Sequence, residues 1–125
     1  MLMNREIKFR GYDKDNKRWR YGHFFETIEG IRNCYNILEN KDIRYYCNYK
    51  SITQYTGVID KNGVEIYEGD IVNFDKVEWG GDDNIHVVTW DKTYGCWCFG
   101  GGSISDMEFR EVIGNIYENP ELLEK

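Results

Sequence analysis

Residues 57–74, with the sequence GVIDKNGVEIYEGDIVNF, constrain the fold more than any other stretch of the chain. Asn62-Gly63 separates the apolar segment Val58-Ile59 from a second apolar segment that begins at Val64, and this arrangement is the strongest short-range signal for a β-hairpin. Gly63 is expected to adopt a positive φ, which glycine reaches without steric cost. The sequence therefore predicts two antiparallel strands joined by a tight turn near the centre of the chain.

Alternation of apolar and polar residues predicts further strands on both sides of this hairpin. In residues 5–10 apolar side chains alternate with charged ones, and a polar turn at 13–17 leads into a returning strand that contains Trp19 and Tyr21. Gly69 is expected to bend or bulge the chain. Later strands are predicted at 85–90, 96–99 and 112–117. Short strands at regular spacing with turns between them favour a mainly β protein, either a small barrel or a sandwich.

Residues 31–42 give no single prediction. Ile31, Cys34, Tyr35 and Leu38 have the spacing of one helical face, so we expect irregular or short helical structure at 31–39. Residues 43–49 alternate and predict a strand. At the other end of the chain, residues 119–121 predict a final helical turn, with Asn as the cap and Pro at the first helical position. Little helix is expected elsewhere.

Length and composition restrict the class of protein. A chain of 125 residues is the size of one domain. Its aromatic content of 16% excludes a disordered tail, and charged residues at 30% with a mean hydropathy of -0.69 exclude a membrane protein. The N-terminus lacks the apolar run of a secretory signal, so we expect a cytoplasmic protein with reduced thiols.

The charges divide the chain into two regions. Residues 1–50 contain 11 Lys and Arg against 7 Asp and Glu, a net charge of +4, whereas residues 51–125 contain 5 against 15, a net charge of -10. We predict a hairpin region at 1–50 and a barrel region at 51–125 within one compact unit. This asymmetry is typical of a nucleic-acid contact on the basic side, or of surfaces that attract each other within one molecule or between copies. Self-association is therefore expected.

The four cysteines do not form a recognisable metal motif. Structural zinc sites usually present paired knuckles with two to four residues between the cysteines, whereas twelve residues lie between Cys34 and Cys47 and one lies between Cys96 and Cys98. Free cysteine commonly packs as a small apolar group. We favour that interpretation and predict no metal and no cofactor.

Candidate catalytic groups are equally weak. His23 and His86 lie in strand-like surroundings with no nucleophile motif beside either. Four carboxylates cluster around the central hairpin and are candidates for cation binding or acid–base chemistry. They are Asp60, Glu65, Glu68 and Asp70. Turn chemistry and solvated strand faces explain them better, so we predict that the protein is not an enzyme.

Three segments of the sequence carry a family resemblance. They are REIKFRGYDKDNKRW at residues 5–19, YTGVIDKNGVEIYEGDIV at 55–72 and EVIGNIYENPELL at 111–123. With these segments the chain resembles the YopX protein family of bacteriophages and of prophages in mainly Gram-positive bacteria. Tyr12 departs from the family pattern, which often has Trp there. The resemblance implies an SH3-like barrel in the C-terminal part, and it implies no reaction and no catalytic residues.

Two functional hypotheses follow. The first is a non-enzymatic phage or prophage accessory protein that contacts an unidentified phage or host protein. The second is nucleic-acid binding by the basic N-terminal hairpin, because cations on phosphates and aromatic rings stacked on bases are typical of single-strand binders. The residues assigned to this interface are Arg5, Lys8, Arg10, Lys14, Lys17, Arg18, Trp19 and Arg20. The acidic C-terminal region argues against the second hypothesis.

Overall fold

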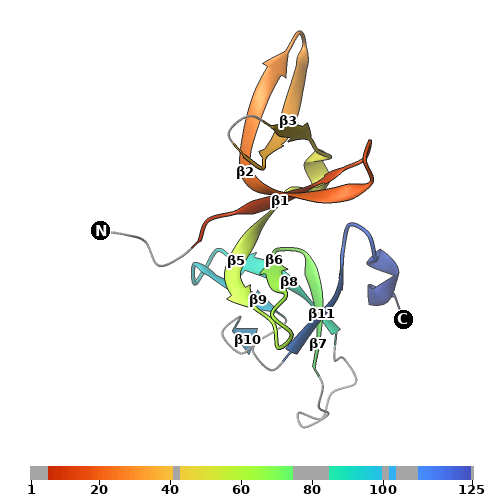
Figure 1. Ribbon diagram of the computed structural model, residues 1–125. Coiled ribbons are helices and arrows are strands. Elements are labelled where there is room, and N and C mark those ends of the chain that lie inside the picture. The colour runs from red at the N-terminus through yellow and green to blue at the C-terminus, as the bar shows by residue number, and fades with distance from the viewer. Residues whose placement is uncertain (1–5, 41–42, 75–84, 100–101, 104–109, 125) are drawn as a thin grey trace. The chain divides into compact units, whose positions relative to one another are not determined.

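The computed structural model describes residues 6–40, 43–74, 85–99, 102–103 and 110–124 (Figure 1). The chain forms two compact units, residues 1–55 and residues 56–125. In the described residues the protein is mainly β, with eleven strands and two short 3-10 helices. The predicted class of mainly β with little helix is therefore confirmed.

The first unit is an antiparallel sheet with the strand order β4-β3-β2-β1-β5. Its elements are β1 (Phe9–Asp13), β2 (Arg18–Glu29), β3 (Arg32–Leu38), β4 (Arg44–Tyr46), η1 (Tyr49–Ser51) and the start of β5 (Thr53–Ile59). The predicted first hairpin is confirmed, because β1 and β2 pair from Asp13 opposite Arg18 to Phe9 opposite Gly22. The Asp13 carboxylate closes the turn by accepting hydrogen bonds from the backbone N–H groups of Asp15 and Asn16.

The helical structure predicted at residues 31–39 is wrong. Residues 32–38 form strand β3, which pairs with β2 along its whole length, from Arg32 opposite Glu29 to Leu38 opposite His23. The Ile37 side chain on this strand is fully buried. Pairing with β2 and burial of Ile37 outweigh the weak helical spacing, since tertiary context overrides local propensity.

The strand predicted at residues 43–49 is shorter than expected. Strand β4 ends at Tyr46, after which the Cys47 N–H donates to the Tyr35 carbonyl and the Asn48 N–H donates to the Tyr12 carbonyl. The Asn48 side chain then caps η1 by accepting from the Lys50 N–H. The backbone therefore leaves β3 after Cys47, and the next N–H, that of Asn48, bonds to β1 instead.

Glycines allow the first unit to fold back on itself. Gly22 has a φ of 155°, and a Cβ at this position would overlap the carbonyl oxygen of Leu38. A Cβ at Gly11 would meet the side chains of Cys47 and Ile37. Only glycine gives a backbone this room. The strand pair β3–β4 consequently lies against the β1–β2 hairpin, with the Arg20 guanidinium 3.5 Å from the centre of the Tyr45 ring.

The second unit begins within β5, and its described residues form seven further elements. They are β6 (Glu65–Tyr67), β7 (Asp70–Phe74), β8 (Ile85–Asp91), β9 (Cys96–Phe99), β10 (Gly102–Ser103), β11 (Arg110–Asn115) and η3 (Pro120–Leu123). β6 pairs with β5, and the other strands form an antiparallel sheet with the order β10-β9-β8-β7-β11. Pairing among the described strands leaves edges and closes no barrel. The core contains Ile66, Val72, Val88 and Phe99.

The central hairpin predicted at Asn62-Gly63 is confirmed. Gly63 has a φ of 81°, and the Asp60 carboxylate accepts hydrogen bonds from the N–H groups of Asn62 and Val64 within the turn. The other carboxylate oxygen of Asp60 accepts from the Val112 N–H, 3.0 Å away on β11. Asp60 therefore stabilises the turn at residues 60–64 and joins it to β11, in agreement with the prediction that this carboxylate has a structural role in a turn.

The turns at Gly69 and at the C-terminus follow similar rules. Gly69 has a φ of 85° between β6 and β7, and the buried Asp70 carboxylate accepts from the Tyr67 N–H across this turn. Pro120 opens η3 at the first helical position, as predicted. Asn119 occupies the predicted N-cap position, but its side chain makes no hydrogen bond within η3 and instead accepts from the Asn115 N–H.

Candidate functional site

The residues predicted for nucleic-acid binding do not form one exposed stripe. Lys14, Lys17 and Arg18 are exposed at the β1–β2 turn, and Trp19 is half-buried next to them. Arg10 and Arg20 are buried, with exposed fractions of 8% and 6%. Lys8 is partly buried, 3.4 Å from the Glu6 carboxylate and over the ring of Tyr55. Arg5 lies outside the described residues.

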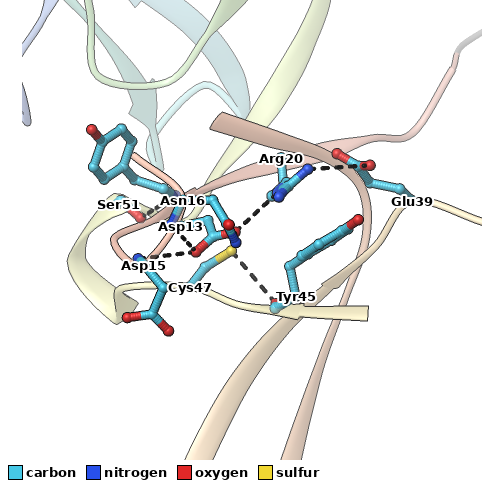
Figure 2. Close-up of polar contacts among 9 residues, drawn as sticks. Asp13, Asp15, Asn16, Arg20, Glu39, Tyr45, Cys47 and Ser51 are labelled. Atoms are coloured by element: carbon cyan, nitrogen blue, oxygen red, sulfur yellow. Dashed lines mark hydrogen bonds and ion pairs between the residues drawn. The ribbon is translucent and has the colours of Figure 1, made fainter. Parts of the chain in front are cut away.

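Arg20 belongs to a buried polar cluster between the two halves of the folded sheet (Figure 2). Its Nε lies 3.1 Å from Oδ2 of Asp13, which is 3% exposed, and its Nη1 lies 3.9 Å from the Glu39 carboxylate. The Tyr45 ring covers the guanidinium. A buried guanidinium with these partners compensates its lost hydration internally. Arg20 therefore holds the first unit together and is not available to phosphates.

Arg10 is also occupied within the first unit. Its Nε donates to the Thr53 hydroxyl at 3.2 Å, and its guanidinium stacks 4.5 Å from the centre of the Trp19 ring. The Trp19 ring in turn packs edge-on against Tyr12 at 5.3 Å. The alternation of cations and aromatic rings in the sequence therefore forms intramolecular cation–π contacts. Lys14, Lys17 and Arg18 are the exposed remainder of the predicted interface within the described residues.

Ionisation in the polar cluster follows from its hydrogen bonds. Burial alone would raise the pKa of Asp13, but hydrogen bonds from the Asn16 side chain and backbone and from Arg20 outweigh burial and hold this pKa below its usual value. Burial raises the pKa of the nearby Cys47 thiol to about 11, and the Asp13 charge adds to this effect. Cys47 is therefore a protonated structural thiol at neutral pH.

The raised pKa and partial burial of Cys47 predict that it reacts more slowly with alkylating reagents than an exposed cysteine does. In the native protein Cys96, which is exposed, should react with iodoacetamide at pH 7.5 at least about tenfold faster than Cys47, because the thiolate is the nucleophile. Mass spectrometry of peptides from a time course measures both rates, and labelling in denaturant provides the control in which the two cysteines become similar. Equal rates in the native protein would contradict the assignment.

The first unit contains a hairpin arm that the sequence did not predict. The arm comprises residues 23–35 of β2 and β3 and projects beyond the rest of the unit (Figure 1). β1 pairs with β2 only as far as Gly22, and β4 pairs with β3 only from Asn36. Ile28 is 76% exposed and Ile31 is fully exposed at the end of the arm. The alternation at Trp19 and Tyr21 predicted a strand in this part of the chain. Nothing in the sequence indicated that β1 and β4 would leave the arm without further paired strands.

An open pocket of about 420 Å³ lies beside the arm. Its lining residues are Glu29, Arg32, Asn33, Cys34, Tyr35, Tyr46 and Cys47. Oε1 of Glu29 accepts hydrogen bonds from Arg44 Nη2 at 3.0 Å and from the Tyr46 hydroxyl at 2.8 Å. The bond to Glu29 raises the pKa of Tyr46. Glu29, Arg44 and Tyr46 are thus hydrogen-bonded to one another, and the residues that line the pocket contain no recognisable catalytic arrangement.

The remaining candidates form no metal-binding group within the described part of the chain. No group of three or more His, Cys, Asp or Glu side chains is placed there to hold a metal ion. The Cys98 thiol lies 3.5 Å from the Thr89 hydroxyl, and the His86 ring packs 6.2 Å from Phe99. Among the helices of the described residues, none is long and apolar enough to cross a membrane.

Comparison with known proteins places these features in a family. No curated protein matches the chain. Among solved structures, the crystal structure of protein EF1440 from Enterococcus faecalis is similar, with a TM-score of 0.57 and 27% sequence identity. This similarity covers 97% of the present chain and 100% of the Enterococcus chain. The family model described as YopX protein matches residues 8–124. Because that match covers nearly the whole chain, the protein belongs to the YopX protein family.

Proposed function

We propose that this protein is a non-enzymatic accessory protein of a bacteriophage or prophage, and that it acts through protein–protein contacts in the cytoplasm of the bacterial host. Family membership supports the phage origin expected from the sequence resemblance. The end of the arm supports the mode of action, because two large apolar side chains, Ile28 and Ile31, are largely exposed there and would gain from burial against another protein.

The arm is the single observation that carries this proposal. Ile28 and Ile31 lie near the β2–β3 turn with exposed fractions of 76% and 102%. A two-stranded ribbon is marginally stable in water by itself. Burial of two isoleucine side chains against a partner would contribute roughly 3–6 kcal/mol before the costs of association. Contact with another protein therefore gives the arm both stability and a role.

A photo-crosslinking amino acid at position 31 tests the proposal directly. During phage growth, this variant should form ultraviolet-dependent adducts with one dominant protein, identified by mass spectrometry. The matched control places the same amino acid at Asn62, which is also exposed at a hairpin turn. Adducts that are absent at position 31, or that have the same partners at both positions, would contradict an arm-specific contact.

Nucleic-acid binding is the second candidate function. The observation that favours it is the exposure of Lys14, Lys17 and Arg18 at one turn, beside the half-buried Trp19 ring. Three exposed cations provide fewer phosphate contacts than the seven predicted from the sequence, because Arg10 and Arg20 are buried and Arg5 and Lys8 are not part of this turn.

Titration of labelled single-stranded DNA at two salt concentrations tests this candidate. Because phosphate contacts release counterions, binding through three contacts should weaken roughly 20-fold between 50 and 200 mM salt. A variant with Lys14, Lys17 and Arg18 changed to Ser should lose binding, whereas a Lys61→Ser control in the second unit should retain it. Absence of binding even at 50 mM salt would remove nucleic acid from consideration.

An SH3-like barrel stays a prediction for residues 51–125. The family resemblance supports it, as does the antiparallel succession β7, β8 and β9 with β11 beside β7. The fold by itself would not determine the function, since small β folds carry many unrelated binding sites.

A further inference from the structure

The outer part of β3 has an open edge. β4 pairs with β3 as far as Asn36, and beyond this pair the Cys47 N–H still donates to the Tyr35 carbonyl at 2.9 Å. The next N–H of the chain, that of Asn48, bonds to β1 instead. Residues 32–34 of β3 therefore have β2 on one side and, among the described residues, no strand on the other.

The hydrogen bond to Tyr35 identifies the backbone groups at this edge. Because the Tyr35 carbonyl accepts from Cys47, the backbone of Tyr35 faces β4. Alternate residues of a strand direct their N–H and C=O groups to the same side, so those of Asn33 point to the open edge, and those of Arg32 and Cys34 face β2. Asn33 thus offers one donor and one acceptor to an extended segment that adds as a further strand.

The pocket beside the arm surrounds this edge. Successive side chains of a strand point to opposite faces, and the pocket is lined by Arg32 and Cys34 from one face of β3 and by Asn33 and Tyr35 from the other. The residues at the end of β4, Tyr46 and Cys47, complete the lining. The pocket of about 420 Å³ therefore occupies the space that a continuation of β4 along β3 would fill.

The charges at the pocket favour an acidic occupant. Both oxygens of the Glu29 carboxylate are engaged, because Oε1 accepts from Arg44 and Tyr46 and Oε2 lies 3.8 Å from the Cys34 thiol. The exposed Arg32 guanidinium makes no ion pair with any of the described residues. Residues of opposite charge that lie opposite each other stabilise adjacent strands. A carboxylate opposite Arg32 therefore complements this edge.

We propose that this pocket binds an extended acidic segment of the partner protein, which adds to β3 as an antiparallel strand in line with β4. One residue of the segment exchanges backbone hydrogen bonds with Asn33. The residue after it places a carboxylate opposite Arg32, and the residue before it places a small or apolar side chain opposite the Cys34 thiol. Ile31 adjoins this site and is fully exposed, so the inference rests on the arm as the contact surface proposed above.

Selection from a bead-bound library of random short peptides tests the site on the purified full chain. We expect the enriched peptides to contain Asp or Glu and to bind the parent in fluorescence anisotropy titrations. Asn33→Pro removes the N–H donor at the open edge and no donor that faces β2. It should weaken binding at least about tenfold, because a carbonyl of the peptide loses its donor. Asn33→Ser keeps the N–H and is the matched control, which should bind like the parent.

A charge exchange tests the acidic side chain separately. Arg32→Glu should weaken binding of a selected peptide about tenfold, because an attractive cross-strand pair becomes repulsive. Replacing the acidic residue of that peptide by Lys should restore binding to this variant and weaken binding to the parent. Arg18→Glu, at an arginine exposed in the β1–β2 turn, is the matched control and should leave the affinity unchanged.

Three results would overturn the proposal. They are a library that yields no peptide with a preference for the parent over Asn33→Pro, enriched peptides without an acidic residue, and equal affinities of the parent and Arg32→Glu. Circular dichroism checks that Asn33→Pro is folded, and Arg32→Glu tests the same site without a change of the backbone. The assay contains no phage or host protein. Crosslinks at position 31 without peptide binding would therefore retain the arm as a contact surface and exclude strand addition.

Discussion

Gly22→Ala is expected to destabilise the first unit by about 3 kcal/mol or more, the combined effect of backbone strain and steric overlap. Its φ of 155° is rarely adopted by residues with a side chain, and the added Cβ would overlap the Leu38 carbonyl oxygen on β3. A backbone atom that belongs to a paired strand cannot move aside as a flexible side chain does. Denaturant unfolding monitored by tryptophan fluorescence measures the loss of stability.

Gly30→Ala is the matched control for this prediction. Gly30 lies in the turn of the same β2–β3 hairpin and also has a positive φ, at 65°, but a Cβ there would meet nothing within 4 Å. This variant should cost roughly 1 kcal/mol, from conformational strain alone. If Gly22→Ala proves as stable as Gly30→Ala, the close approach of β3 to Gly22 is not required for the fold.

Asp13→Ala should destabilise the protein by roughly 3–5 kcal/mol, the usual cost of removing one partner of a buried ion pair. The substitution leaves the guanidinium of Arg20 buried beneath Tyr45 without its nearest carboxylate, and it also removes the hydrogen bonds that close the β1–β2 turn. Asp15→Ala is the control in the same turn, because the Asp15 side chain is exposed, and it should change stability by less than about 0.5 kcal/mol.

A double variant separates the ion pair from the turn. Asp13→Ala combined with Arg20→Met removes both buried charges, so it should be more stable than the sum of the two single losses predicts. Strict additivity of the two losses would show that Asp13 and Arg20 do not act as a pair.

The same carboxylate predicts how stability depends on pH. The folded-state pKa of Asp13 is lowered from the ordinary value of 3.8. Its contribution is therefore present above the unfolded-state pKa and is lost as the pH falls through the lower, folded-state pKa. Asp13→Asn should show a smaller loss of stability than the parent over this acidic range in urea titrations. Parallel pH profiles for the two proteins would contradict this assignment.

The sequence by itself determined the local elements of this protein. The alternation before and after residues 13–17 predicted the first hairpin, and Asn62-Gly63 predicted the central one, because both signals act between residues that are close in the chain. Asp60 was correctly interpreted as a turn residue for the same reason. The three family-like segments identified the YopX family, which the match over residues 8–124 shows.

Only the tertiary structure decided which charged residues are available for binding. Arg10 and Arg20 have the same sequence pattern as Arg18, yet they are buried because Thr53 and Tyr45, distant in the chain, lie against them. The helical structure predicted from the spacing at residues 31–39 was wrong for the same reason, because pairing with β2 makes this segment a strand. The outer parts of β2 and β3 lack further neighbours because β1 begins only opposite Gly22 and β4 ends opposite Asn36. Periodicity records which way a side chain points from its own strand, whereas exposure depends on what distant segments place opposite it.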